Sequence, residues 1–158
     1  MSRFFLLPGT VRFASSPERI ETVLGSCVSV SLRDPRTAAA ALCHCVLPEA
    51  PPRTRTRERF RFCDTAVEAM LEWFADRNVP AARLEVKLFG GAEVLPGGSR
   101  PSGASVGALN AQCAITVLAS FGLAPQARET GGATGRYLVF DTATGGVWIR
   151  QLSKEHTA

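Results

Sequence analysis

The sequence lacks the grouping of cysteines and histidines that builds a metal site. Its five cysteines include no Cys-x-x-Cys pair, and its two histidines, His44 and His156, lie far apart in the chain. A zinc site is therefore not expected. The odd number of cysteines is also unlike a disulfide framework and favours reduced thiols.

Long hydrophobic runs are absent as well. No stretch approaches the length needed to span a membrane, and the four-residue apolar run at residues 4–7 is too short for a signal peptide. We therefore expect a cytoplasmic protein without membrane insertion.

Glycine-rich segments occur, but the motifs that make such segments bind phosphate do not. Residues 90–91, 97–107 and 131–135 contain no Gly-Lys-Ser/Thr sequence and no Gly-x-Gly-x-x-Gly that opens a helix. These segments predict tight turns and close backbone contacts. With 158 residues, 46% hydrophobic content and no internal repeat or linker, the chain is expected to form one domain over residues 1–158.

Hydrophobic periodicity predicts strands before, between and after two helices. The first helix is expected from Asp64, as N-cap, to about residue 77, and the second over about residues 106–121, stopped by Gly122. Their expected apolar faces comprise Val67, Met70, Leu71 and Phe74 in the first, with Trp73 at its edge, and Leu109, Ala114, Val117, Leu118 and Phe121 in the second. Strands are expected over residues 3–7, 11–14, 19–24, 26–33, 40–47, 83–89, 126–130, 136–141 and 147–152. This order predicts an α/β fold of the α+β kind, a layered sandwich with helices on a largely antiparallel sheet.

A cysteine and a histidine are the clearest candidates for chemistry. Cys27 follows a glycine turn at the head of one alternating stretch, and His44 lies in the next. A thiol and an imidazole held together make a nucleophile and its base. A symmetric four-residue loop over residues 34–37 would pair residues whose numbers sum to 71, which places Cys27 opposite His44. Their Cβ atoms would then be about 4.5–5.5 Å apart, although an odd loop length would shift this register.

The same register separates Cys27 from two neighbouring thiols. Cys43 and Cys45 fall on the opposite face, beside Val28 and Val30, and are expected to be buried as small hydrophobic residues. A cysteine in an apolar strand is more often part of a core, and a single histidine is more often structural. The pattern alone therefore leaves a structural and a catalytic interpretation open.

Positive charge is concentrated in one segment. Of the 18 Lys and Arg residues, only Lys87 and Lys154 are lysine, and five arginines alternate over residues 53–61. A solvated basic loop and a nucleic-acid patch are both possible interpretations, but aromatic interleaving is poor and no binding motif surrounds the run. Docking onto an acidic protein surface is the third, because arginine suits bidentate contacts with carboxylates.

Several short segments, in the same order along the chain, resemble the CheD family of chemoreceptor glutamine deamidases. The similar segments are Leu24-Gly25-Ser26-Cys27-Val28, Leu42-Cys43-His44-Cys45-Val46-Leu47-Pro48, Lys87-Leu88-Phe89-Gly90-Gly91-Ala92, Gly107-Ala108-Leu109-Asn110-Ala111, Thr130-Gly131-Gly132-Ala133-Thr134-Gly135-Arg136 and Arg150-Gln151-Leu152. The resemblance extends from about residue 8 to residue 152. It implies a sandwich related to the catalytic domain of deamidating bacterial toxins.

The resemblance also implies a reaction and its residues. The reaction is hydrolysis of glutamine side-chain amides on methyl-accepting chemotaxis receptors to glutamate and ammonia, without metal or cofactor. Cys27 falls on the family's nucleophile and His44 on its base. The family's third residue is a threonine before the cysteine that orients the histidine; here either Thr22 or Glu21 stands near that place, and Thr22 is the residue we expect.

Two other roles stay open at this point. CheD-like proteins also resemble partners of a CheC-like chemotaxis phosphatase, so the chain could act mainly as a regulatory subunit. A cysteine peptidase or transamidase would use similar chemistry, but the sequence contains no surrounding peptidase signature.

Overall fold

The computed structural model describes residues 1–94 and 104–153. In chain order, the elements are β1 (Ser2–Phe5), β2 (Val11–Ala14), β3 (Glu18–Leu24), β4 (Val28–Arg33), β5 (Ala40–Cys43), η1 (Thr56–Arg61), α1 (Cys63–Ala75), η2 (Ala81–Arg83), β6 (Glu85–Gly90), α2 (Val106–Ser120), β7 (Ala127–Thr130), β8 (Arg136–Asp141) and β9 (Val147–Gln151). The expected glycine-rich segment 97–107 lies largely outside the described residues.

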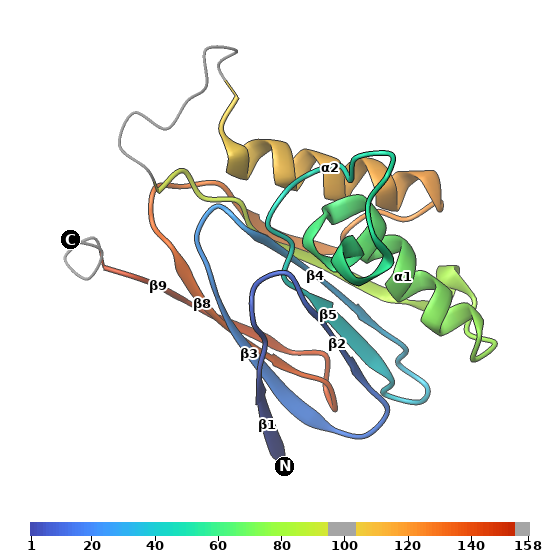
Figure 1. Cartoon of the computed structure of the whole chain (residues 1–158). Helices are drawn as coiled ribbons and strands as arrows, with labels where there is room; N and C mark the ends of the chain where they lie inside the picture. The colour runs from blue at the N-terminus through green and yellow to red at the C-terminus, as the bar shows by residue number, and fades with distance from the viewer. Residues whose placement is uncertain (95–103, 154–158) are drawn as a thin grey trace.

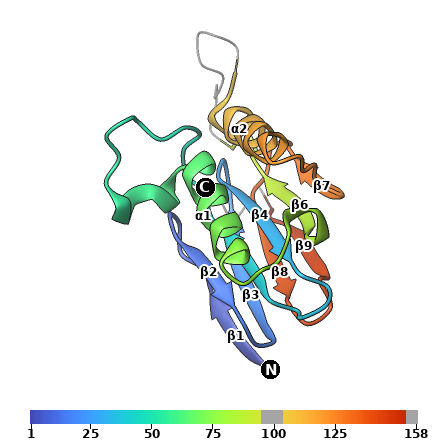
Figure 2. The same cartoon turned by 90° about the vertical axis from the view of Figure 1, so that its right-hand side faces the viewer.

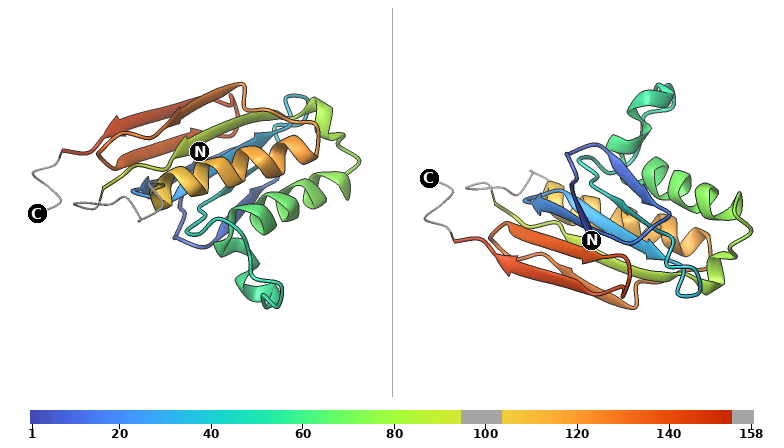
Figure 3. Two further views of the ribbon diagram at one scale, coloured as in Figure 1. Left: turned by 90° about the horizontal axis from the view of Figure 1, so that it is seen from above. Right: turned by 90° about the horizontal axis from the view of Figure 1, so that it is seen from below.

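The strands form two sheets, and both α-helices lie on one of them (Figure 1). The first sheet has the order β1-β3-β8-β9 and the second the order β2-β5-β4-β6-β7. Paired strands are antiparallel except for β1 with β3 and β6 with β7. In Figure 2 helix α2 is seen nearly end-on, and Figure 3 shows the two sheets and the helices as successive layers. The predicted class is confirmed, although periodicity alone does not indicate that the strands divide into two sheets.

The second sheet is the middle layer, and its strand β4 is buried along its whole length. Successive side chains of a strand point to opposite faces. Val28, Val30 and Leu32 therefore join the core under the helices, and Ser29 and Ser31 point toward the first sheet. The core between the sheets comprises Leu6, Ile20, Leu24, Ala40, Leu42, Phe89, Leu138 and Phe140.

The helices agree with their periodicity except at their ends. All four predicted core residues of α1 are buried, and Trp73 packs at the edge of the same cluster. The expected N-cap is wrong, because α1 begins at Cys63 and the Asp64 carboxylate instead accepts hydrogen bonds from the N–H groups of Ala50 and Thr65. In α2 the expected core position of Phe121 is also wrong, since that side chain lies at the C-cap and is 44% exposed.

The hairpin of β4 and β5 has a different register from the expected one. Its pairs, such as Ser31 with Leu42 and Arg33 with Ala40, have numbers that sum to 73. The prediction that Cys27 lies directly opposite His44 is therefore wrong.

Asp34 explains this shift of register. Its N–H pairs with the carbonyl of Ala39 at 2.8 Å, so the four-residue loop begins one residue later, at position 35. Its carboxylate accepts hydrogen bonds from the N–H of Arg36 and the hydroxyl of Thr37, which stabilises the turn. The observed pairing differs from the expected one by two residues, and side chains alternate between faces with a period of two. Cys27 and His44 therefore still lie on the same face of the sheet.

The strands outside the hairpin lie close to their predicted positions. β6, β7, β8 and β9 each begin and end within two residues of the expected bounds, and Leu84, Val86 and Leu88 are buried as predicted. The loop between β8 and β9 is the predicted glycine-bearing turn.

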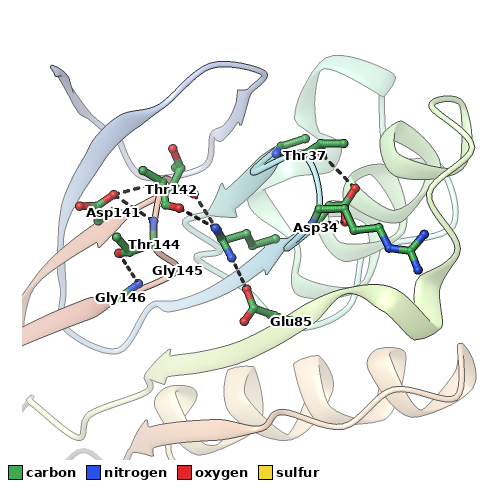
Figure 4. A network of polar contacts seen from close by, with 12 residues as sticks. Asp34, Thr37, Glu85, Asp141, Thr142, Thr144, Gly145 and Gly146 are labelled. Carbon is green, nitrogen blue, oxygen red and sulfur yellow. Dashed lines mark hydrogen bonds and ion pairs between the residues drawn. The ribbon is translucent and has the colours of Figure 1, made fainter.

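A buried arginine joins the two sheets at one end of the sandwich. Arg33, at the end of β4, donates to the carbonyl oxygens of Thr142 (2.7 Å) and Ala143 (2.6 Å) in the β8–β9 loop. It also forms a 2.6 Å ion pair with Glu85 of β6. Figure 4 shows Glu85 and Thr142 within this network. The network fixes the loop of the first sheet against the second sheet.

Replacing Arg33 by methionine should destabilise the protein, because two loop carbonyls and the Glu85 carboxylate lose their donor. We expect the free energy of unfolding to fall by about 2–4 kcal/mol in urea titration. Arg36→Met, an exposed arginine in the neighbouring turn, serves as the control and should change it by less than about 0.5 kcal/mol. Equal losses in the two variants would contradict this role of Arg33.

Candidate active site

Cys27 lies in the short turn that carries the chain from the first sheet to the second. The turn joins β3 to β4, and the Cys27 side chain is half-buried against the core between the sheets. Its carbonyl accepts a hydrogen bond from Gly91 N–H at 2.9 Å, and the Gly25 carbonyl accepts one from Ala92 N–H at 3.0 Å. The end of β6 therefore holds the turn in place.

This close approach requires glycine. Gly90 has a φ of 104°, which L-residues with a side chain rarely adopt, and a Cβ there would lie 2.3 Å from the carbonyl oxygen of Cys27. Gly90, the last residue of β6, thus lets the backbone of this strand approach the cysteine turn.

Asn110 ties the cysteine turn to the segment that follows His44. Its side-chain amide donates to the carbonyls of Ser26 and Val46, each at 3.0 Å, and the residue is completely buried in α2. On the observed register Val46 stands across from Cys27. The sequence analysis did not single out this residue. The available signal was a polar side chain in an otherwise apolar helix, because a buried amide needs hydrogen-bond partners.

His44 follows the last residue of β5 and is held at both its backbone and its ring. Its N–H donates to the Thr10 carbonyl at 3.0 Å, and its carbonyl accepts from Gly9 N–H at 2.8 Å. The ring is 2% exposed, and Nδ1 lies 2.7 Å from the hydroxyl oxygen of Thr22 in β3. This hydrogen bond therefore joins the histidine, which follows a strand of the second sheet, to the first sheet across the core between them.

The partners of Thr22 determine which ring nitrogen carries the proton. The Thr22 hydroxyl donates its one hydrogen to the carbonyl of Leu6 at 2.8 Å. It must then accept from His44, so the neutral ring has its proton on Nδ1 and a lone pair on Nε2. This tautomer leaves Nε2 able to act as a base.

Glu21, the other candidate for orienting the histidine, lies elsewhere. It precedes Thr22 in β3, and neighbouring strand residues point to opposite faces. Its carboxylate pairs with Arg3 at 2.6 Å and accepts a hydrogen bond from Tyr137. The Arg3 guanidinium lowers the pKa of this carboxyl group. The structure therefore brings Thr22, and not Glu21, to His44.

Burial keeps both candidate catalytic groups uncharged at neutral pH. It lowers the pKa of the His44 ring to about 4 and raises the pKa of the Cys27 thiol above its ordinary value. Within the described residues the two side chains are not hydrogen-bonded to each other. On the observed register, Ser29 stands opposite His44 and Cys27 is its diagonal neighbour. Diagonal neighbours typically have Cα atoms about 7–8 Å apart.

A short side chain and a small cavity lie near the pair. The completely buried Ser29 has a short side chain on the shared face. A cavity of about 50 Å³ adjoins the cysteine turn and is lined by residues that include Ser26, Ala92 and Ser105. In the described ranges, neither Ser26 nor Cys27 uses its N–H in a backbone hydrogen bond.

The other cysteines contribute to the core and not to this site. Cys43 and Cys45 are completely buried in the cluster under the helices, as predicted, with Cys63 beside them. Cys113 is half-buried on α2. Among residues 1–94 and 104–153, no group of three or more Cys, His, Asp or Glu could hold a metal ion. Neither helix of this part of the chain is long and apolar enough to cross a membrane.

Comparison with known proteins points to one family. The family described as CheD chemotactic sensory transduction matches residues 46–151. A probable chemoreceptor glutamine deamidase CheD 2 from Geobacter sulfurreducens is 41% identical, over 95% of this chain and 90% of that protein. Probable chemoreceptor glutamine deamidases CheD from Rhodospirillum rubrum and Maridesulfovibrio salexigens are each 39% identical, over 99% and 96% of this chain and 86% and 93% of their own lengths.

The lowered pKa of His44 should appear as a dependence of stability on pH. The unfolded ring, with a pKa near 6.5, binds a proton more readily than the folded ring, with a pKa of about 4. The contribution of the neutral His44 ring to the free energy of unfolding is therefore complete above pH 6.5 and is lost as the pH falls toward 4. Between pH 7 and pH 4, urea titration should show the wild type losing about 3 kcal/mol more than His44→Gln. Equal losses would contradict a buried neutral histidine.

Proposed function

The chain belongs to the CheD family, and on that premise we propose that it deamidates glutamine side chains of methyl-accepting chemotaxis receptors. The products are glutamate and ammonia. The observation that carries the proposal is the Thr22–His44 hydrogen bond, because it leaves a basic Nε2 on the face that also bears Cys27. A cysteine amidohydrolase needs such a pair.

The first half of the reaction forms a thioester. His44 Nε2 takes the proton of the Cys27 thiol as the sulfur attacks the carboxamide carbon of the receptor glutamine. Because both groups are neutral at pH 7, this proton transfer accompanies the attack and does not precede it. The N–H groups of Ser26 and Cys27 are candidates to stabilise the oxyanion. The imidazolium then returns its proton to the departing nitrogen, which leaves as ammonia.

The second half hydrolyses the thioester. His44 takes a proton from water as the water oxygen attacks the thioester carbon, and the proton returns to the sulfur as the bond to Cys27 breaks. One amide and one water thus give one carboxylic acid and one ammonia. Thr22 acts through His44 by holding its ring and tautomer, and is therefore a positioning residue.

The proposal includes the cytoplasm as the location, the compartment in which free thiols persist. Binding to a CheC-like phosphatase stays a prediction. The peptidase and transamidase alternatives differ from deamidation in the mass of the product.

Removing the nucleophile or the base should abolish deamidation of a receptor cytoplasmic fragment. We expect Cys27→Ala to show no activity above background, and His44→Ala to be slower by at least about 10²-fold. Mass spectrometry of the glutamine-containing peptides measures the conversion of amide to carboxylate. Cys113→Ala, which removes a half-buried thiol outside the site, is the matched control and should retain wild-type activity. Full activity in Cys27→Ala would refute the assignment.

The two candidates for orienting the histidine can be separated in the same assay. Thr22→Ala removes the acceptor for Nδ1–H and should lower kcat by about 10²-fold, whereas Thr22→Ser keeps the hydroxyl and should restore most of the rate. Glu21→Gln should leave kcat unchanged, since that carboxylate contacts Arg3 and Tyr137. A larger loss of kcat in Glu21→Gln than in Thr22→Ala would reverse this assignment.

A further inference from the structure

A projecting loop between β5 and α1 carries much of the chain's positive charge. This arginine loop, residues 48–61, contains five arginines and two glutamates, a net charge of 5 − 2 = +3 in a chain with a net charge of +4. It includes the short helix η1 and extends away from the layered body of the molecule (Figures 2 and 3).

The base of the loop is attached beside the candidate active site. The N–H groups of Val46 and Leu47 both donate to the carbonyl of Arg61, at 2.8 and 3.1 Å, which closes the loop two residues after His44. The Asn110 side chain joins Val46 to the residue before Cys27. The loop therefore starts and ends at the strand segment that stands across from the nucleophile.

Three arginines in the middle of the loop have exposed side chains and form no ion pair with the described residues. These residues are Arg53, Arg55 and Arg57. Arg59 differs, since it lies 3.8 Å from the Glu72 carboxylate. The N–H donors of these three guanidinium groups are therefore available to a binding partner.

The chemistry of the loop favours a protein carboxylate over a nucleic acid. Surfaces that bind single-stranded nucleic acid combine cations with aromatic rings on which the bases stack. The one aromatic residue of the loop, Phe60, is half-buried and packs edge-on against Phe13, with ring centroids 6.3 Å apart. Arginine without a stacking platform suits bidentate pairing with Asp and Glu side chains.

We propose that the arginine loop docks an acidic stretch of the receptor next to the target glutamine. The inference rests on the proposed function, since it assigns a binding surface to the same substrate. The loop's tip is separated from its base by about seven residues, so the contacted carboxylates lie within about 25 Å of the reacting amide. Because the arginines do not touch the reacting atoms, they act on substrate binding and association.

Charge reversal in the loop tests the proposal through the kinetics of deamidation. The Arg55→Glu/Arg57→Glu variant should raise KM for a receptor cytoplasmic fragment by about tenfold, with the main effect on KM and not on kcat. The control variant, Arg36→Glu/Arg128→Glu, changes the net charge equally at exposed positions outside the loop and should keep the wild-type KM. Salt should raise the wild-type KM and have a smaller effect on the loop variant.

The outcomes distinguish the docking proposal from the proposed function on which it rests. Equal KM values for the loop and control variants, with deamidation intact, would overturn the docking and leave the proposed function standing. No deamidation by the wild type would contradict the proposed function itself. Loss of binding to a single-stranded DNA oligonucleotide in the loop variant, with KM for the receptor fragment unchanged, would assign the loop to nucleic acid and refute the docking. Arg55→Gln/Arg57→Gln, which removes charge without reversing it, should give an intermediate KM.

Discussion

The hydrogen bond between Thr22 and His44 is the contact on which the proposed chemistry depends. It crosses the core between the two sheets, so the proposed base follows a strand of one sheet and its proposed orienting residue lies in the other. Because the Thr22 hydroxyl donates to Leu6, it accepts from Nδ1 of the ring and leaves Nε2 unprotonated. Burial keeps the ring neutral, with a pKa of about 4, so the lone pair of Nε2 is available at physiological pH.

The rest of the fold keeps this pair of sheets in register around the cysteine turn. At the end that holds the candidate active site, Gly90 lets β6 approach the Cys27 backbone, and Asn110 holds Ser26 to the segment after His44. At the other end, Arg33 fixes the β8–β9 loop against the second sheet. Contacts at both ends thus limit sliding of one sheet over the other.

Alternation and helical periodicity were sufficient to predict most elements and the shared face of Cys27 and His44, because these depend on local spacing. The register was not predictable, since it depended on Asp34 closing the turn through contacts of its own side chain. The choice between Thr22 and Glu21 depended on which face of β3 meets the other sheet. Asn110 was missed because its two acceptors come from distant parts of the chain.

The decisive measurement is the protonation of the two nitrogens of the His44 ring. Nitrogen-15 NMR of the imidazole can be assigned simply, because the chain has only two histidines, His44 and His156. At pH 7 we expect a neutral His44 ring with a proton on Nδ1 and none on Nε2. A proton on Nε2, or a charged ring at that pH, would contradict this expectation.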